Sequence, residues 1–201
     1  MRIVSGMAGG IRLAAPSGRD VRPTGDRVKE ALFAMLGDLR GATVVDLFAG
    51  SGALGLEAWS RGARRVFLIE KTPKHIRTIE ENRDAVAAAM GIPPSDDAAP
   101  QIVRADVRAA PVRLAALAGQ VDLILADPPY QPKKGSLGPA EFLQLDDLAR
   151  WAGNALLALE HETGTPLPWT PESAWKQLRR RRYGTTTLTF AEPAEPTGTS
   201  R

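Results

Sequence analysis

Short apolar segments alternate with amphipathic segments along most of this chain, and this alternation constrains its fold more than any other feature. Residues 43–48, 65–69, 101–103 and 121–126 are rich in β-branched and aliphatic side chains, as buried strands are. The segments between them carry apolar residues at helical spacing. Strands that alternate with helices form a mostly parallel sheet covered on both faces. The sequence therefore predicts an α/β fold.

Two helices have recognisable starts. Thr72 offers an N-cap hydroxyl, and Pro73 suits the first turn because its missing N–H would have no partner there. We expect a helix over residues 73–90. Thr24 and Asp26 open an earlier helix by the same kind of signal.

The chain of 201 residues is long enough for one domain with a full core. Residues 1–24 are rich in Gly and Arg, and we expect them to form a strand or hairpin appendage. The main domain is predicted over residues 25–190. Residues 191–201 are polar and proline-containing, which predicts a disordered tail. Residues 91–100 and 131–139 are predicted loops.

The composition excludes several kinds of functional site. There is no cysteine, which excludes disulfides and thiolate nucleophiles, and the two histidines, His75 and His161, lie far apart in sequence, so no metal site is expected. No apolar segment has the length of a membrane span or a secretory signal, so the cytoplasm is the expected compartment. A pI of about 9.5 is compatible with an anionic partner.

A glycine-rich loop follows the first predicted strand and allows two functional interpretations. Gly50, Gly52 and Gly55 satisfy the dinucleotide pattern, and Glu70 lies where a ribose-binding carboxylate is expected. Asp46, however, would repel a pyrophosphate at the helix N-terminus. It suits S-adenosylmethionine, whose ammonium and sulfonium are cationic and which carries no phosphate. The alternative is that the glycines bind no ligand and only form a tight turn between the strand and the helix.

Asp106 follows the third predicted strand and could accept a hydrogen bond from an adenine amino group, or cap the helical segment that begins at Val107. The predicted cofactor site comprises Asp46, Phe48, Gly50, Ser51, Gly52, Glu70, Asp106 and Val107.

The segment Asp127-Pro128-Pro129-Tyr130 directly follows the apolar run 121–126, at a strand end where open α/β sheets bind ligands. An exocyclic base amine is a poor nucleophile, so an enzyme must hold its two N–H groups with acceptors. The Asp127 carboxylate and the Pro128 carbonyl can supply both, and the prolines stiffen the loop. Tyr130 offers a face for base stacking. An ordinary turn with an inward-packed tyrosine is the structural alternative.

These motifs together resemble the bacterial RsmD family. The resemblance is carried by Met-Arg-Ile-Val-Ser-Gly at 1–6, by Arg-Pro-Thr at 22–24 with residues 26–33, by residues 45–58, by Asp127 to Tyr130, and by Arg-Tyr-Gly at 182–184. It implies a class I S-adenosylmethionine-dependent methyltransferase (Rossmann-like) fold with seven strands, the last antiparallel, and methylation of the N2 amine of a guanine in 16S ribosomal RNA.

The implied partner is 16S rRNA, either naked or within an assembling small subunit, and the expected enzyme is a monomer that acts without a metal or a membrane. We assign RNA contacts to Arg22, Thr24, Arg27, Lys133 and Lys134. The N-terminal arginines would make residues 1–24 an RNA-binding appendage, and residues 179–182 form the longest basic run. Solvated surface charge is the alternative for each arginine.

Three other functions compete with rRNA methylation. A DNA adenine-N6 methyltransferase would use the same Asp-Pro-Pro-Tyr chemistry, but so short a chain leaves no separate domain to read a DNA sequence. A nicotinamide-dependent oxidoreductase lacks an obvious proton donor near the glycine loop. A non-catalytic RNA-binding module leaves Asp46 and Asp127 without a role.

Overall fold

A seven-stranded mixed sheet forms the centre of the protein, with strand order β3-β2-β1-β4-β5-β7-β6. The computed structural model describes residues 1–16, 25–93, 96–132 and 135–194. Strands β1 to β5 pair in parallel, whereas β7 runs antiparallel to both β5 and β6. This is the class I S-adenosylmethionine-dependent methyltransferase fold, so the predicted fold class is confirmed.

The elements follow one another as the alternation predicts. The strands are β1 (Thr43–Asp46), β2 (Arg65–Glu70), β3 (Gln101–Arg104), β4 (Leu123–Ala126), β5 (Leu156–Glu162), β6 (Trp175–Tyr183) and β7 (Thr186–Pro193). The helices are α1 (Asp26–Leu36), α2 (Ala53–Ser60), α3 (Pro73–Met90), α4 (Ala110–Arg113), α5 (Pro139–Phe142) and α6 (Asp146–Ala152), with short 3-10 turns at Val107–Ala109 and Ala115–Leu117.

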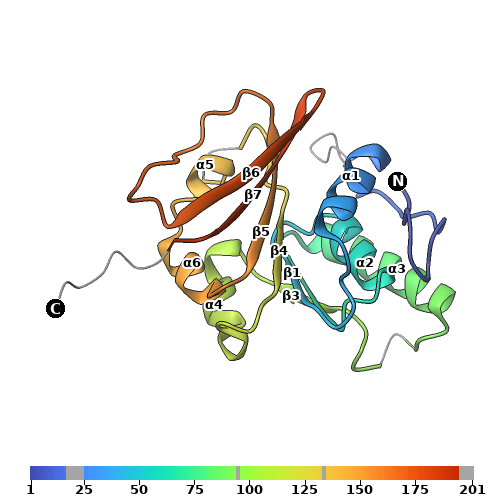
Figure 1. The fold of residues 1–201 in the computed structure, drawn as a ribbon. Helices are drawn as coiled ribbons and strands as arrows, with labels where there is room; N and C mark the ends of the chain where they lie inside the picture. Colours follow the sequence, from blue (N-terminus) through green and yellow to red (C-terminus); the bar gives the residue numbers. More distant parts are fainter. Residues whose placement is uncertain (17–24, 94–95, 133–134, 195–201) are drawn as a thin grey trace.

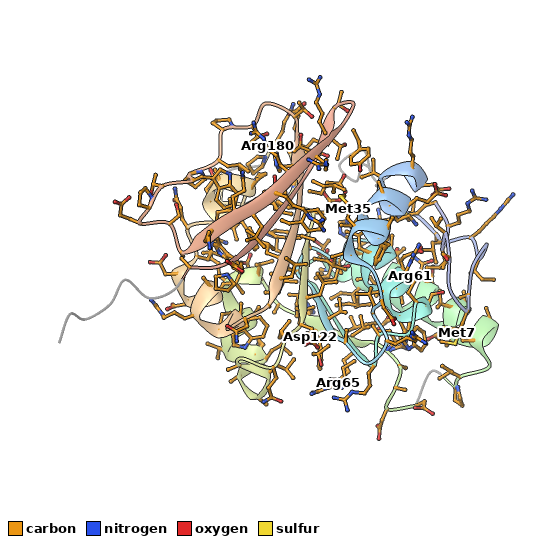
Figure 2. The ribbon with its side chains drawn as sticks, in the orientation of Figure 1. Met7, Met35, Arg61, Arg65, Asp122 and Arg180 are labelled. Atoms are coloured by element: carbon orange, nitrogen blue, oxygen red, sulfur yellow. The ribbon has the colours of Figure 1, made fainter. Side chains whose placement is uncertain are left out.

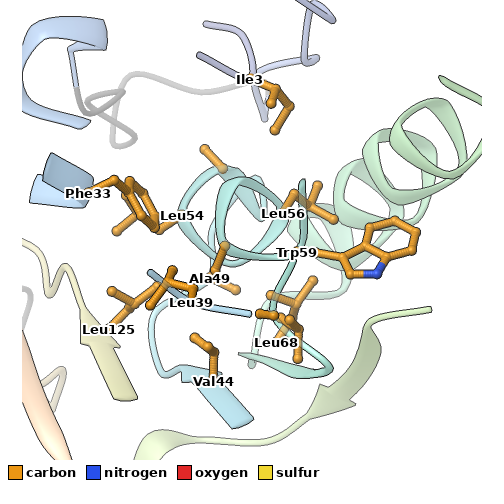
Figure 3. Packing of buried hydrophobic residues seen from close by; sticks show 14 of the residues in the cluster. Ile3, Phe33, Leu39, Val44, Ala49, Leu54, Leu56, Trp59, Leu68 and Leu125 are labelled. Atoms are coloured by element: carbon orange, nitrogen blue, oxygen red, sulfur yellow. The ribbon is translucent and has the colours of Figure 1, made fainter. Parts of the chain in front are cut away.

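Helices cover both faces of the sheet. Figure 1 shows α1, α2 and α3 on one side and α4, α5 and α6 on the other. Successive strand residues face opposite layers, because side chains alternate along a strand. In β1, Val44 belongs to the core beneath α1 to α3, and Val45 to the core beneath α4 to α6. Figure 3 shows the first of these cores, in which Phe33 of α1 lies beside Leu54 of α2.

Several local predictions need correction. The helix over residues 73–90 begins and ends as predicted, but the Thr72 hydroxyl makes no capping hydrogen bond. Instead, the Thr72 N–H donates to Glu70 Oε1 at 2.8 Å. Near the C-terminus, β7 continues to Pro193 and Ala191 is fully buried. The prediction of a disordered tail that starts at residue 191 is therefore wrong. Residues 195–201 lie outside the described part.

The N-terminal segment packs against the core of the domain. A single antiparallel bridge joins Arg2 to Arg12, which agrees with the predicted hairpin, and Ile3 is fully buried. The Val4 and Ser5 N–H groups donate to the Glu57 carboxylate of α2 at 2.7 and 3.0 Å. A buried carboxylate with two backbone donors fixes the segment onto α2.

Lys29 of α1 completes this contact. Its ammonium lies 3.7 Å from Glu57 Oε2, both side chains are fully buried, and it also donates to the Arg2 carbonyl. Arg61 donates to the other carboxylate oxygen at 2.8 Å. Burial lowers the pKa of Lys29, and the negative charge of Glu57 opposes that shift. The ion pair therefore ties the N-terminal segment, α1 and α2 together.

We predict that Glu57→Ala destabilises the protein by about 3–5 kcal/mol, because it leaves the Lys29 ammonium buried without its counter-ion. Chemical denaturation measures this as a lower free energy of unfolding. Asp26→Ala serves as the control, since it breaks the exposed Arg2–Asp26 pair nearby and should cost about 1 kcal/mol or less. Equal losses for the two variants would contradict a special role of the buried pair.

Candidate active site

The parallel pairing of β1 with β4 brings the two sequence motifs together. Asp46 pairs with Leu125, so the loop after β1 and the loop after β4 leave the same edge of the sheet side by side. Strands β2 and β3 lie on one side of β1, whereas the next strand in the chain, β4, lies on its other side. In open α/β sheets, ligands bind where the strand order reverses in this way.

A cleft of about 910 Å³ lies at this edge. Its lining includes most of the residues predicted for the cofactor and for the target base: Asp46, Phe48, Gly50, Ser51, Glu70, Asp106, Val107, Asp127, Pro128, Pro129 and Tyr130. Gly52 is not among the lining residues. It takes the N-cap position of α2 with a φ of 80°, and a side chain there would press against Leu56 and Ile79.

The glycine loop is shaped by backbone requirements. Gly50 adopts a φ of 57°, in the left-handed region that favours glycine. Gly55 lies where α2 crosses the sheet, and a Cβ atom there would come within 2.2 Å of Leu68 Cδ2. The third glycine of the motif therefore permits close helix–sheet packing, whereas the first shapes the cleft wall.

Asp46 is a buried carboxylate at the floor of the cleft, with 1% of its surface exposed. Oδ2 accepts a hydrogen bond from the Gly55 N–H at 3.0 Å, while Oδ1 has no partner among the described residues. Burial raises the pKa of Asp46 to about 7, although backbone N–H groups of Gly55 and Phe48 partly offset that shift. A buried acceptor without a partner is suited to a ligand's cationic donor.

Glu70 closes the adjacent wall at the end of β2. Its Oε2 accepts from the Gly50 N–H at 3.0 Å and its Oε1 from the Thr72 N–H. His75 Nδ1 lies 3.5 Å from the same carboxylate. Glu70 thus joins the glycine loop to the start of α3 and still faces the cleft, where a ribose hydroxyl could donate to it.

Asp106 has the capping role of the two considered for it, and its role toward adenine stays a prediction. Its carboxylate accepts from the Arg108 N–H at 3.1 Å, which is an N-cap contact, and from the Lys71 ammonium at 3.3 Å. The same residue and Val107 line the cleft. Phe48, which also lines the cleft, packs edge-on against Phe142 with ring centroids 5.6 Å apart.

The Asp127–Tyr130 segment forms the other end of the cleft. Asp127 and Tyr130 are partly exposed, Pro128 is buried and Pro129 is exposed. The Tyr130 hydroxyl donates to Glu160 Oε1 at 3.2 Å and lies 3.1 Å from Thr186 Oγ1. Burial raises the pKa of Tyr130, and the negative charges of Glu160 and Asp127 raise it further. The tyrosine ring is therefore held at its hydroxyl end while one side borders the cleft.

Sequence reasoning missed several residues of this cleft. Glu160 at the end of β5 and Thr186 at the start of β7 both line it, as do Met1 and Val28 from the N-terminal region. One signal was available for Glu160, because this carboxylate directly follows the apolar run 155–159 of a buried strand, where carboxylates are uncommon. The others depend on tertiary packing and leave no local pattern.

Most of the residues predicted to contact RNA lie in parts of the chain that the structure does not describe. Arg22, Thr24, Lys133 and Lys134 lie outside the described residues, and Arg27 is exposed on α1 but is not among the lining residues. The basic run lies on the edge strand β6, where Arg180, Arg181 and Arg182 are exposed. Figure 2 shows Arg180 at the opposite end of the molecule from Arg65.

Metal-binding and membrane-spanning features do not occur within the described ranges. No three potential metal-ligating side chains form a group there. None of the helices in these ranges is long and apolar enough to cross a membrane.

Comparison with known proteins decides the family. Residues 1–192 match the family described as Conserved hypothetical protein 95. The chain belongs to this family. The resemblance to the RsmD proteins is thereby confirmed at the family level, since Ribosomal RNA small subunit methyltransferase D of Escherichia coli (strain K12) is 32% identical over 185 residues, 92% of this chain and 85% of that protein.

Two further comparisons agree with this family assignment. YlbH of Bacillus subtilis (strain 168) is 32% identical over 187 residues, 92% of this chain and 95% of its own length. The solved structure of yhhF from Escherichia coli superposes with a TM-score of 0.69 at 30% identity, and the match covers 96% of this chain and 97% of that one. The protein is thus a methyltransferase of this family, and its glycine loop and Asp-Pro-Pro-Tyr segment lie in one cleft of that shared fold.

We predict that the affinity for S-adenosylhomocysteine increases about tenfold from pH 6 to pH 8, because Asp46 must be ionised to attract the ligand's ammonium and its pKa is about 7. Isothermal titration calorimetry measures the change. Asp46→Asn should bind more weakly and lose the pH dependence. His75→Gln should keep it, and a flat profile in the wild type would contradict the role given to Asp46.

Proposed function

We propose that this methyltransferase transfers a methyl group from S-adenosylmethionine to the exocyclic N2 amine of a guanine in 16S ribosomal RNA. One observation carries the proposal: the acceptor groups of Asp127 and Pro128 lie in the same cleft as Asp46, Glu70 and the glycine loop. A cofactor site and an amine-binding site that share one cleft can bring a methyl donor and a base amine together.

The cofactor, when bound, supplies an electrophilic methyl group on a sulfonium. The residues present fit it, because Asp46 offers a buried acceptor for the ammonium and Glu70 a carboxylate for the ribose hydroxyls. Asp106 and Val107 would face the adenine. The negative charge of Glu70 acts on Asp46, and two neighbouring carboxylates in one cleft suit a cationic ligand better than a dinucleotide. Neither the family nor the fold supports the nicotinamide alternative.

Asp127 has the task of orienting the amine. Accepting one N–H while the Pro128 carbonyl accepts the other leaves the nitrogen lone pair directed away from both acceptors. The nitrogen's proton becomes acidic only after methyl transfer has placed positive charge on it, so a strong base is unnecessary beforehand. Tyr130, held by Glu160 and Thr186, would provide the stacking face.

The proposed partner is the rRNA itself, naked or in an assembling small subunit, which would place the enzyme in the cytoplasm. The turn between β6 and β7 supports this proposal, because Tyr183, Thr185 and Thr186 line the cleft and the exposed arginines of β6 lie next to them. Phosphates beside an extracted guanine could contact these arginines.

The function is tested by incubating the protein with methyl-labelled S-adenosylmethionine and unmethylated small-subunit rRNA or particles, followed by mass spectrometry of the nucleosides. Labelled N2-methylguanosine is the expected product. In a parallel reaction with unmethylated DNA, labelled N6-methyl-2′-deoxyadenosine, with no label in the rRNA, would favour the DNA alternative and contradict the proposal.

We predict that Asp127→Ala lowers single-turnover methylation on the order of a hundredfold or more, because the amine loses a positioned acceptor. Asp127→Asn keeps an acceptor oxygen and the side-chain shape, so it should retain measurable activity. Cofactor affinity should change little in both variants, as calorimetry can check. Equal inactivity of the two variants would show that a charged Asp127 is required in the transition state.

We predict that Arg180→Gln with Arg182→Gln weakens RNA binding and reduces the slope of log affinity against log salt by about 0.7–0.9 for each phosphate that no longer pairs with an arginine. Fluorescence anisotropy at several salt concentrations measures this slope. Arg64→Gln is the matched control, because Arg64 is exposed next to the start of β2, at the edge opposite the cleft. Identical slopes for all three proteins would contradict an RNA contact at β6.

A further inference from the structure

Asn82 of α3 is a buried side chain that joins two distant parts of the chain. Only 2% of its surface is exposed. Oδ1 accepts a hydrogen bond from the Ala14 N–H at 2.7 Å. Nδ2 donates to the Ala14 carbonyl at 3.0 Å and to the Ser51 carbonyl at 2.8 Å, so both amide hydrogens are used. A buried amide bonded in this way has one defined orientation, and Asn82 therefore holds residues 14 and 51 in a fixed relation.

One of these contacts is at the cofactor site. Ser51 is buried, follows Gly50 in the glycine loop and lines the cleft. Glu70 accepts from the Gly50 N–H, and Asn82 donates to the Ser51 carbonyl. The backbone of this cleft wall is thus held at two points, by side chains that come from β2 and α3.

The other contact is with the N-terminal segment, residues 1–16. The Leu13 N–H donates to the Met1 carbonyl at 3.1 Å, so the segment doubles back on itself. Met1 lines the cleft, and its sulfur lies 3.4 Å from Ser51 Oγ. Figure 1 shows the segment in dark blue beside α2 and α3. It therefore contacts the glycine loop directly through Met1 and indirectly through Asn82.

A side chain that only fastened the N-terminal segment would not need a bond to the glycine loop. Ser60 of α2 shows such an arrangement. Its hydroxyl accepts from the Ala8 N–H at 2.9 Å and donates to the Ser5 carbonyl at 2.8 Å, and Ser60 is not among the described residues that line the cleft. Asn82 differs from Ser60 because its third hydrogen bond reaches a residue of the cleft wall.

We propose that Asn82 is a positioning residue for the cofactor, which sets the Ser51 backbone at the cleft wall and couples it to the docked N-terminal segment. A cofactor bound against this wall keeps Ser51 where Asn82 requires it, and so does the docked segment. Such coupling is reciprocal, so the cofactor should stabilise the docking of the segment as much as docking strengthens cofactor binding. The inference concerns the methyl donor and does not depend on the proposed RNA substrate.

Calorimetry with S-adenosylhomocysteine tests the positioning role. Asn82→Leu keeps a similar side-chain volume and removes all three hydrogen bonds. Its affinity should fall at least about tenfold, because the Ser51 carbonyl loses a buried donor. A misfolded fraction of the variant would lower the binding stoichiometry and leave the affinity of the folded molecules unchanged.

Ser60→Ala is the matched control, because it also removes hydrogen bonds to the N-terminal segment, which Glu57 and Asn82 still hold. Chemical denaturation should show a lower free energy of unfolding for Ser60→Ala and for Asn82→Leu. The affinity of Ser60→Ala for S-adenosylhomocysteine should nevertheless stay within about twofold of the wild type, since its lost contacts are separate from the cleft.

Hydrogen exchange of the wild-type protein, followed by NMR, tests the coupling without a substitution. S-adenosylhomocysteine should slow exchange of the Ala14 N–H, which donates to Asn82. Exchange of the Ala98 N–H, which donates to Asp96 in an exposed loop, should not change. Wild-type affinity in Asn82→Leu, or an equal loss in Ser60→Ala, would overturn the positioning role. Unaltered exchange at Ala14 would overturn the coupling.

Discussion

The parallel pairing of β1 with β4 is the constraint on which the site depends. Asp46 pairs with Leu125, and this register sets the glycine loop and the Asp127–Tyr130 segment at the same edge of the sheet. A shift of one residue would turn the side chains of β4 to the other face. The two core layers, which take alternate residues of each strand, hold that register, so packing far from the cleft determines the geometry within it.

Buried charge has two different roles in this protein. The Lys29–Glu57 pair is fully buried, its members neutralise each other, and it joins the N-terminal segment to α1 and α2. Asp46, in contrast, is a buried carboxylate that lines the cleft, and the charge that acts on it is the negative one of Glu70. A carboxylate kept in this way costs stability and provides an acceptor prepared for a ligand. The first role maintains the fold, and the second serves binding.

Much of the fold and part of the site could be predicted from local patterns. The α/β alternation, the helix over residues 73–90 and the loops after Asp46 and Ala126 are visible in sequence because each has its own periodicity or turn residues. Thr72 is the N-cap of this helix as predicted, but its hydroxyl makes no capping hydrogen bond. Three features could not be predicted, since each depends on a neighbour distant in sequence: the contact between Tyr130 and Glu160, the docking of residues 1–5 onto Glu57, and the extension of β7.

The central claim is that a single cleft holds the methyl donor and a guanine amine in contact. A bisubstrate analogue, with the guanine N2 nitrogen joined through a short linker to the cofactor's sulfur position, tests this claim without RNA. Calorimetry should show tighter binding than for S-adenosylhomocysteine, and Asp127→Ala should remove the gain. The account would be contradicted if the guanine-linked compound bound no more tightly than S-adenosylhomocysteine, or no more tightly than its isomer linked through adenine N6.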